Sequence, residues 1–387
     1  MKAIICEYHS WNSIYRIGNH HYAREFMSNG WEVLWVSHPV SWLHGLKPGN
    51  LQRMKISSSP PFHHPDGPME FIPRTVLPFL NTAILNSQWV LKNTLNHCSP
   101  SIGRVLESSG FMNADLLWIT DTSMHGLIDL AQPKTVAVRI ADDNTKFRDM
   151  PPSLEWAETR LCRKADILFV TSSPLLETRR KKYPNKIHLL RNGVEHSHFR
   201  GDFPRPQEYA KIDGPIAIYI GAIEDWFDVG WVEALAKWRK DIFIVLIGRV
   251  GKDLSRIRRF RNVKILGPKP YGSIPSYLAH ADCGIIPFQR IPLVESVSPI
   301  KMMEFFASGL PVVSASWKEL ENLRSPAFLA HSKDEFVSLI ETAIDKNDKG
   351  SNRAVYKSYA ERNSWKARYV DVMKVLEPFL QQRKLPE

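Results

Sequence analysis

Cysteine is scarce in this sequence, and the few cysteines are dispersed. The chain has four, Cys6, Cys98, Cys162 and Cys283, and no two of them form a Cys-x-x-Cys pair. Cysteine and histidine also show no spacing that is typical of a zinc site. A disulfide framework needs more cysteines in a shorter chain. We therefore expect reduced, buried thiols, no structural disulfide and no metal site.

Long apolar runs are missing as well. The stretch with the fewest charges, residues 75–91, is interrupted by Pro78 and by the amides of Asn81 and Asn86. Such groups cannot be left unsatisfied in hydrocarbon, so this stretch is not expected to span a membrane. Residues 1–11 lack the apolar core and the cleavage site of a signal peptide. The sequence therefore predicts a cytoplasmic protein.

Acidic residues are fewer than basic ones. The chain has 51 Lys and Arg but 40 Asp and Glu, which gives a net charge of +11. This excess predicts an anionic partner, and nucleic acid, an acidic membrane surface and a phosphate-bearing substrate all qualify. The basic residues are dispersed and no nucleic-acid-binding motif occurs, which disfavours nucleic acid. Neither G-x-G-x-x-G nor G-x-x-x-x-G-K-[ST] is present, so dinucleotide-binding and P-loop sites are disfavoured too.

What the sequence does contain is two series of short apolar runs that alternate with helical patterns. Such alternation predicts parallel sheets with helices on both faces, so the fold class is α/β, with two doubly wound Rossmann-like domains facing a cleft. The expected strands of the first series are 3–6, 32–37, 115–120, 135–140, 167–171 and 186–190, and those of the second are 216–220, 243–247, 263–266, 283–287 and 311–314.

The chain of 387 residues is long enough for two domains. The first series gives a domain over residues 1–195, and the second gives a domain over residues 214–363. Residues 196–213 are rich in Pro, Gly and polar side chains, as a linker should be. Residues 364–387 contain an amphipathic helical pattern, which predicts a C-terminal helix that docks on the protein and crosses back to the first domain.

The stretch SVSPIKMMEFFASGLPVVSAS, residues 296–316, places a lysine where a helix begins. Ser298 and Pro299 suit the N-cap and first helical positions, and Gly309 suits the end of the helix. Lys301 then lies in the first turn, where the helix dipole disfavours a cation by up to about 1 kcal/mol. An anion bound there would explain the lysine, and Glu304 would lie on the same helix face. An ordinary exposed ion pair of Lys301 with Glu304 is the alternative.

Polar residues follow two expected strands of the first domain. Asp142 and Asp143 come directly after residues 135–140, and a carboxylate at such a strand end suits a general base, although capping of the next loop is the alternative. After the first strand the chain carries His9, Arg16 and Asn19, with His21 opening the following helix; all are suited to a hydroxyl-rich or anionic ligand.

Together these features resemble the GT-B glycosyltransferases. The segment SPIKMMEFFASGLPVVSA is similar to their donor-site helix, NVKILGPKPYGSIPSYLAHADCGIIPF to the elements before it, and RNGVEHSHF to their interdomain crossover. Within this superfamily the likeness is greatest to the bacterial glucuronosyltransferase of xanthan assembly and to related exopolysaccharide and teichuronic-acid enzymes. The common retaining pattern has two glutamates eight positions apart, but the residue eight before Glu304 is Ser296. This departure favours an inverting mechanism.

The resemblance implies specific roles for these residues. Asp142 falls where the family has a catalytic base, Lys301 where a lysine holds the donor pyrophosphate, and Glu304 where a residue contacts the ribose. The remaining residues divide between a donor side, with Ile223, Pro268, Lys269 and Phe288 around the base and Ser298, Pro299 and Ile300 at the helix start, and an acceptor side with His9, Arg16, Asn19, His21 and Asp143.

The implied function is metal-independent and cofactor-free transfer of a sugar from a nucleotide-diphosphate sugar, most simply a UDP-sugar, to a glycan or lipid-linked acceptor in cell-surface polysaccharide synthesis. A nucleotide-sugar epimerase of the same fold is the alternative. A lipid-linked acceptor would bring the protein to the cytoplasmic face of the inner membrane as a peripheral protein. Basic and aromatic residues suited to that contact are Trp42, Leu43, Lys47, Arg53 and Lys55, with residues 74–89 beside them.

Overall fold

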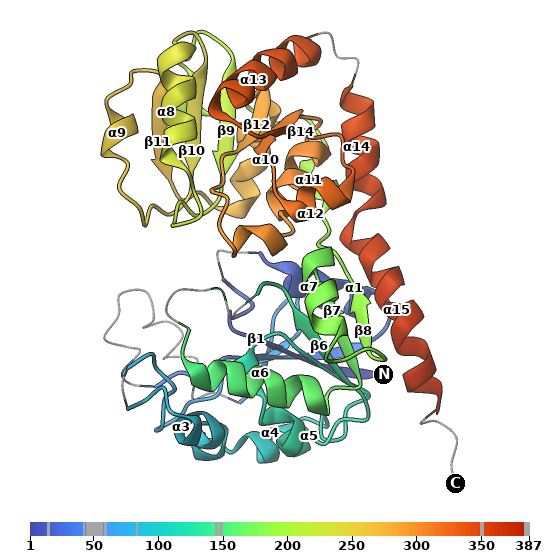
Figure 1. Ribbon diagram of the computed structural model, residues 1–387. Helices are drawn as coiled ribbons and strands as arrows, with labels where there is room; N and C mark the ends of the chain where they lie inside the picture. Colours follow the sequence, from blue (N-terminus) through green and yellow to red (C-terminus); the bar gives the residue numbers. More distant parts are fainter. Residues whose placement is uncertain are drawn as a thin grey trace. The chain divides into compact units, whose positions relative to one another are not determined.

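The computed structural model describes residues 1–13, 16–41, 43, 57, 60–82, 84–143, 146, 150–348 and 352–382. The chain divides into two compact units (Figure 1). The N-terminal unit comprises Met1–Thr171, Leu175–Leu190 and Tyr369–Glu387, and the C-terminal unit comprises Ser172–Pro174 and Arg191–Arg368. Each unit has its own sheet and its own hydrophobic core.

The N-terminal unit is built on an eight-stranded sheet with the order β3-β4-β2-β1-β5-β6-β7-β8. Its pairs are parallel except for the antiparallel pair of β3 with β4. Its central strands are nearly continuous apolar runs, because both faces of a doubly wound sheet are buried. The strands are β1 (Lys2–Glu7), β2 (Glu32–Ser37), β3 (Phe62–His63), β4 (Met69–Phe71), β5 (Leu116–Ile119), β6 (Val136–Ile140), β7 (Ile167–Val170) and β8 (Ile187–Leu189).

Helices lie on both faces of this sheet (Figure 1). They are α1 (Gly18–Ser28), α3 (Gln88–Asn93), α4 (Ile102–Ser108), α5 (Leu127–Ala131), α6 (Pro152–Lys164) and α7 (Ser173–Arg180). The last helix of the chain, α15 (Trp365–Gln382), also contributes to this unit from Tyr369 on. The Tyr369 ring packs edge-on against Phe26 of α1, with ring centroids 5.2 Å apart. The C-terminal segment therefore packs on the N-terminal unit, as its amphipathic pattern predicts.

The C-terminal unit has a six-stranded parallel sheet with the order β11-β10-β9-β12-β13-β14. Its strands are β9 (Ile216–Ile220), β10 (Phe243–Ile247), β11 (Val263–Gly267), β12 (Cys283–Ile286), β13 (Val312–Ala315) and β14 (Phe328–Ala330). Its helices are α8 (Val229–Trp238), α9 (Ser255–Arg258), α10 (Ile274–Ala279), α11 (Ile300–Ala307), α12 (Lys318–Leu323), α13 (Lys333–Asp348) and α14 (Arg353–Arg362).

Every strand expected from the sequence is present, within one or two residues at each end. The predicted α/β class with two parallel-sheet domains is confirmed. The short strands β3, β4 and β14 were not expected, because two or three residues carry too little periodicity to be recognised. The expected linker, residues 196–213, lies within the C-terminal unit. Its Phe199, Tyr209 and Ile212 are buried in the core of that unit, so this segment is packed.

No helix within the described residues is both long enough and apolar enough to cross a bilayer. The four cysteines are free and buried, as expected from their number and spacing.

Candidate active site

Helix α11 begins at Ile300, one residue later than the sequence predicts. The N-cap is Pro299, with φ −79° and ψ 109°, and it offers no side-chain cap. The expected capping by Ser298 is therefore wrong, because the extended ψ of Pro299 moves the helix start beyond it. Ser298 is buried instead, and its carbonyl accepts a 2.7 Å hydrogen bond from the Asn192 side chain. The side chain of the N-cap residue therefore does not cap the first turn of α11.

Lys301 lies in that uncapped first turn, between two aromatic rings. Its Nζ is 4.8 Å from the ring centroid of Phe288 and 5.4 Å from that of Tyr219. Phe288 is buried and stacks on Trp317, with centroids 5.6 Å apart and an angle of 19° between the rings. Cation–π contacts of this kind hold an ammonium in place without neutralising its charge. The Lys301 side chain is therefore positioned beside the helix N-terminus.

Two glycines at neighbouring strand ends keep the backbone close to Lys301. Gly221 follows β9 and has φ +145°, and a Cβ there would lie 2.9 Å from Cε of Lys301. Gly248 follows β10 and has φ +148°, and a Cβ there would lie 1.9 Å from the carbonyl oxygen of Gly221. Both conformations are strained for any residue with a Cβ. The carboxyl ends of these strands therefore present backbone groups rather than side chains, which lets a flat or charged ligand approach closely.

Glu304, one turn after Lys301 on α11, is partly buried. Burial raises its pKa to about 7, the nearby Lys301 lowers it, and Glu195 raises it further. Lys301 therefore acts electrostatically on Glu304. A carboxylate that titrates near neutrality accepts hydrogen bonds best when a cation stays close to it.

The other residues expected on the donor side do not form one cluster of side chains. Ile223 is fully buried, so only its backbone is available, and its N–H donates to the Arg249 carbonyl at 2.8 Å. Pro268 is exposed. Lys269 makes an ion pair with Glu208, with 2.6 Å between Nζ and Oε1. Of this set, Phe288 lies against Lys301.

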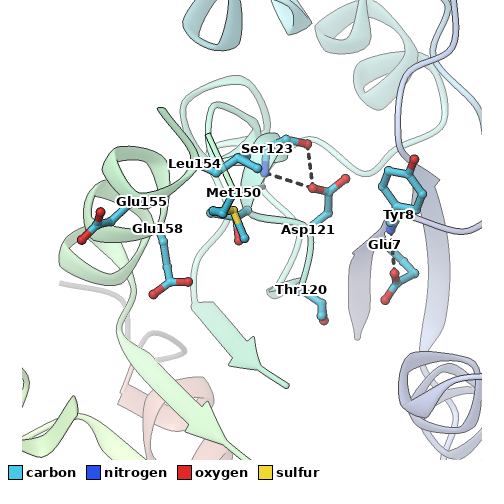
Figure 2. A pocket seen from close by; sticks show the side chains of 10 residues that line it. Glu7, Tyr8, Thr120, Asp121, Ser123, Met150, Leu154, Glu155 and Glu158 are labelled. Atoms are coloured by element: carbon cyan, nitrogen blue, oxygen red, sulfur yellow. Dashed lines mark hydrogen bonds between the residues drawn. The ribbon is translucent and has the colours of Figure 1, made fainter. Parts of the chain in front are cut away.

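A pocket of about 220 Å³ opens in the N-terminal unit at the carboxyl ends of β1 and β5 (Figure 2). Helix α6 forms its opposite wall, as Figure 2 shows. The lining residues are Glu7, Tyr8, Thr120, Asp121, Thr122, Ser123, Met150, Leu154, Glu155 and Glu158. The sequence did not single out any of these residues as functional, because nothing local marks Glu7 or Asp121 until the sheet brings β1 and β5 together.

Glu7 is the last residue of β1, and its carboxylate is held from both sides. Oε1 accepts a 2.7 Å hydrogen bond from the N–H of Tyr8, and Oε2 accepts one of 2.7 Å from the amide of Asn19. The side chain is only 4% exposed. Burial raises its pKa to about 7, and the charge of Asp121 adds to this effect.

Asp121 is fixed beside Glu7 by two partners. His38 Nδ1 lies 2.8 Å from Oδ2, and the hydroxyl of Ser123 donates to Oδ1 at 2.6 Å. Although burial opposes it, His38 and these hydrogen bonds lower the pKa of Asp121 below its usual value. Two neighbouring carboxylates thus titrate at different pH values, which is the arrangement found where a site must hold and release a proton.

The residues expected on the acceptor side occupy different places. Asn19 is 1% exposed, and its amide donates to Glu7 and to Thr120 while its oxygen accepts from Trp118. It therefore positions the pocket wall. His21 is buried and His9 is half-buried. Arg16 donates to the Trp11 carbonyl at 2.7 Å.

Asp142 and Asp143 follow β6, the strand next to β5 in the sheet. Both are half-buried, and neither is among the residues that line the pocket. Asp143 lies 3.7 Å from Arg179, which also pairs with Glu158 at 2.5 Å, so this arginine links Asp143 to the pocket wall. Within the part of the chain that the structure describes, no three His, Cys, Asp or Glu side chains gather where they could hold a metal ion.

Both units match known families. Residues 4–171 match the N-terminal domain of the glucuronosyltransferase GumK, and residues 214–346 match glycosyl transferases group 1. A relative from Bacillus subtilis, "Putative teichuronic acid biosynthesis glycosyltransferase TuaH", is 25% identical over 231 residues, which is 56% of this chain and 58% of the relative. The chain thus matches about 58% of the length of this curated relative.

Solved structures resemble the chain over nearly its whole length. Sucrose-phosphate synthase of Thermosynechococcus elongatus has a TM-score of 0.69 at 14% identity and covers 99% of this chain and 100% of its own. HepE of Anabaena, in complex with UDP and glucose, has a TM-score of 0.66 at 15% identity and covers 98% and 100%. The chain has the GT-B fold, and each of its units matches a glycosyltransferase family model. The group 1 match contains α11 with Lys301, and the GumK match contains the pocket strands β1 and β5. The matches give no support to the epimerase alternative.

Proposed function

We propose that the protein transfers a sugar from a UDP-sugar to a glycan or lipid-linked saccharide in cell-surface polysaccharide synthesis. The single observation that carries the proposal is Lys301, held between Phe288 and Tyr219 at the uncapped start of α11. The printed descriptions of similar proteins support the direction: HepE binds UDP-glucose, and TuaH is assigned to teichuronic acid synthesis.

Lys301 would stabilise the leaving nucleoside diphosphate. As the glycosidic bond to the donor phosphate breaks, negative charge grows on the pyrophosphate, and N–H groups at a helix start together with an ammonium stabilise that charge. The close backbone at Gly221 and Gly248 leaves room for the phosphates and the base. Glu304 would accept from the ribose hydroxyls. This arrangement supplies the required positive charge from the protein alone, so the proposed reaction is metal-independent and needs no cofactor.

Asp142 remains the proposed general base, which takes the proton of the acceptor hydroxyl as that hydroxyl attacks the anomeric carbon. Its support is its place directly after β6, at the same edge of the sheet as Glu7 and Asp121. General-base catalysis contributes about 10² to 10⁴ in rate. The proposed outcome is inversion at the anomeric carbon.

Two substitutions test these roles after a thermal-shift screen has identified the nucleotide sugar. Lys301→Ala should weaken UDP binding at least about tenfold, since a hydrogen bond to a charged group contributes about 1.5–3 kcal/mol. Asp142→Asn should leave UDP binding nearly unchanged and lower kcat by about 10² or more. Lys240→Ala is a matched control, because Lys240 is exposed and precedes β10 at the opposite edge of the sheet. Unchanged UDP affinity in Lys301→Ala would refute the role of this lysine.

Peripheral contact with a membrane is a second part of the proposal. Trp42, Lys47, Arg53 and Lys55 lie outside the described residues, and Leu43 is half-buried. The neighbouring stretch, residues 74–89, exposes Val76, Ile84 and Trp89 by 71%, 79% and 63%. Exposed apolar side chains beside the exposed Arg74 suit the surface of an anionic bilayer.

Vesicle co-sedimentation tests this contact. Binding to vesicles that contain anionic lipid should fall several-fold in Trp89→Ala and at high salt, since both the apolar and the charged contributions are then reduced. Trp238→Ala removes a tryptophan of the C-terminal unit that is 51% exposed, and it should leave binding unchanged. Equal losses in both variants would argue against a specific membrane surface at residues 74–89.

A further inference from the structure

The pocket of the N-terminal unit has an unusual charge for a protein of net charge +11. Among the described residues that line it, the charged ones are the carboxylates Glu7, Asp121, Glu155 and Glu158, and none is a Lys or Arg. The other polar groups are the hydroxyls of Tyr8, Thr120, Thr122 and Ser123. Such a wall accepts hydrogen bonds, as the hydroxyl groups of a sugar require, and it repels negative charge.

Glu7 and Asp121 are fixed parts of this wall. Strands β1 and β5 are neighbours, and Cys6 pairs with Ile119, so Glu7 at the end of β1 lies beside the residues that follow β5. Asn19 and the Tyr8 N–H hold Glu7, and His38 and Ser123 hold Asp121. Neither carboxylate can turn away from the cavity without breaking these hydrogen bonds.

The surroundings of the pair show how strongly this site resists negative charge. His38 keeps Asp121 ionised, and the Asp121 charge in turn helps to raise the pKa of Glu7 to about 7, although Arg139 acts in the opposite direction. Arg179 pairs with Glu158 and lies 3.7 Å from Asp143, so the charge of Glu158 is balanced and the repulsion comes from the other carboxylates. Because the Asp121 charge makes Glu7 harder to ionise, it also disfavours a negatively charged group of a ligand at the same place.

The size of the pocket suits one sugar ring. Its volume of about 220 Å³ is below the roughly 300–1,000 Å³ of pockets for drug-sized ligands. Met150 and Leu154 supply an apolar patch, against which the C–H face of a sugar ring can pack.

We infer that Glu7 and Asp121 set the charge of the acceptor: the pocket admits an uncharged or amino-bearing sugar ring and excludes a ring that carries a carboxylate or a phosphate. This inference rests on the proposed function and deepens it. The donor and the acceptor then bind to sites of different charge. Lys301 in the C-terminal unit binds the pyrophosphate of the donor, and the pocket of the N-terminal unit binds the acceptor ring. If the acceptor is lipid-linked, its own phosphates stay outside this pocket.

Matched acceptor pairs test the inference in the full-length protein. A p-nitrophenyl glycoside and the corresponding p-nitrophenyl uronide differ at one position of the ring, where a hydroxymethyl group is replaced by a carboxylate. For the pairs of the gluco, galacto and manno series, the best uncharged acceptor should have a kcat/KM at least about tenfold above that of its uronide. Glu7→Gln and Asp121→Asn should each reduce this ratio several-fold, because each removes a carboxylate from the wall.

The ratio is a readout that loss of folding does not change, since both acceptors meet the same fraction of folded enzyme. Glu107→Gln, at an exposed residue of α4, should leave the ratio as it is in the wild type. If a buried substitution prevents folding, Glu155→Gln changes the charge of the same wall at an exposed side chain. A wild type that uses both members of a pair equally, or a ratio unchanged in all three pocket variants, overturns the inference.

Direct binding separates this inference from the proposed function. Ligand-observed NMR with the same pairs, without any nucleotide sugar, should show binding of the uncharged glycoside and weaker binding of the uronide. If this preference is present but no nucleotide sugar supports transfer, the proposed function fails and the charge selection stands. If transfer occurs but the uronide binds as well as the glycoside, the charge selection fails and the function stands.

Discussion

At the scale of single residues, the two glutamates with raised pKa values are the most informative. Glu7 in β1 and Glu304 in α11 both have a pKa near 7, and burial is the main cause in each. Their neighbours differ, because Glu7 faces the charge of Asp121 whereas Glu304 faces Lys301. One carboxylate therefore lies in a site that disfavours anions, and the other lies beside the cation that we assign to an anionic donor.

The raised pKa of Glu7 makes a prediction about stability and pH. Its folded-state pKa of about 7 lies above the ordinary value of 4.5, so the folded protein binds more protons than the unfolded chain between these values. The free energy of unfolding contributed by this group therefore falls as pH rises from about 4.5 to 7, by up to about 3 kcal/mol. Below pH 4.5 this contribution is fully present.

Glu7→Gln removes this titration. The charged groups that face Glu7 are Asp121, held by His38, and Arg139, and all of them remain in the variant. Relative to the wild type, the variant should therefore gain about 1–3 kcal/mol between about pH 5 and pH 8. Urea unfolding at both pH values measures the difference. A constant difference between variant and wild type across this range would show that Glu7 does not titrate there.

At the scale of the elements, the strand ends of the C-terminal sheet depend on glycine. Gly248→Ala should destabilise the protein by about 1–3 kcal/mol, because φ of +148° is strained for alanine and the new Cβ would meet the carbonyl of Gly221. It should also weaken UDP binding, since Gly221 lies against Lys301.

Gly272→Ala is the control for this substitution. Gly272 has no positive φ and open space around its Cβ position, so alanine there should change the free energy of unfolding by less than about 1 kcal/mol. Urea denaturation and UDP titration of the two variants check both effects. Equal stability of the two variants would mean that the backbone after β10 can move away from Gly221 at little cost.

The elements were predictable from the sequence where the signal is local. An apolar run such as Ile216–Ile220 indicates a buried strand, and a glycine such as Gly309, with φ +80°, indicates a helix end. Ser298 was assigned one position wrongly, because Ser-Pro is compatible with two helix starts and only the ψ angle of Pro299 decides between them.

The pocket of the N-terminal unit could not be predicted in the same way. Glu7 looks like a charge at the end of an apolar strand, and its meaning depends on the pairing of β1 with β5 over a hundred residues later. Asn19 was expected on the acceptor side, and from the start of α1 its amide donates to the pocket residues Glu7 and Thr120. Contacts between residues far apart in the sequence determine the surroundings of both Glu7 and Asn19, and no local sequence signal predicts these contacts.

At the scale of the whole molecule, two units with separate cores imply two unfolding events. The core of the C-terminal unit contains residues from Val194 to Ala360, and that of the N-terminal unit contains residues from Ile4 to Ile187. The proposed donor residues all belong to the C-terminal unit. A ligand that binds one folded unit stabilises that unit by RT ln(1 + [L]/Kd), which is about 2.7 kcal/mol at a hundred times Kd.

UDP should therefore raise the midpoint of one calorimetric transition and leave the other in place. Lys301→Ala should abolish the rise, because the ligand then loses its main charged contact, whereas Glu7→Gln should keep it. Differential scanning calorimetry with and without UDP distinguishes these cases, and tryptophan substitutions in each unit assign the transitions. A single transition that shifts as a whole would show that the cores unfold together, and a shift that persists in Lys301→Ala would place UDP elsewhere on the molecule.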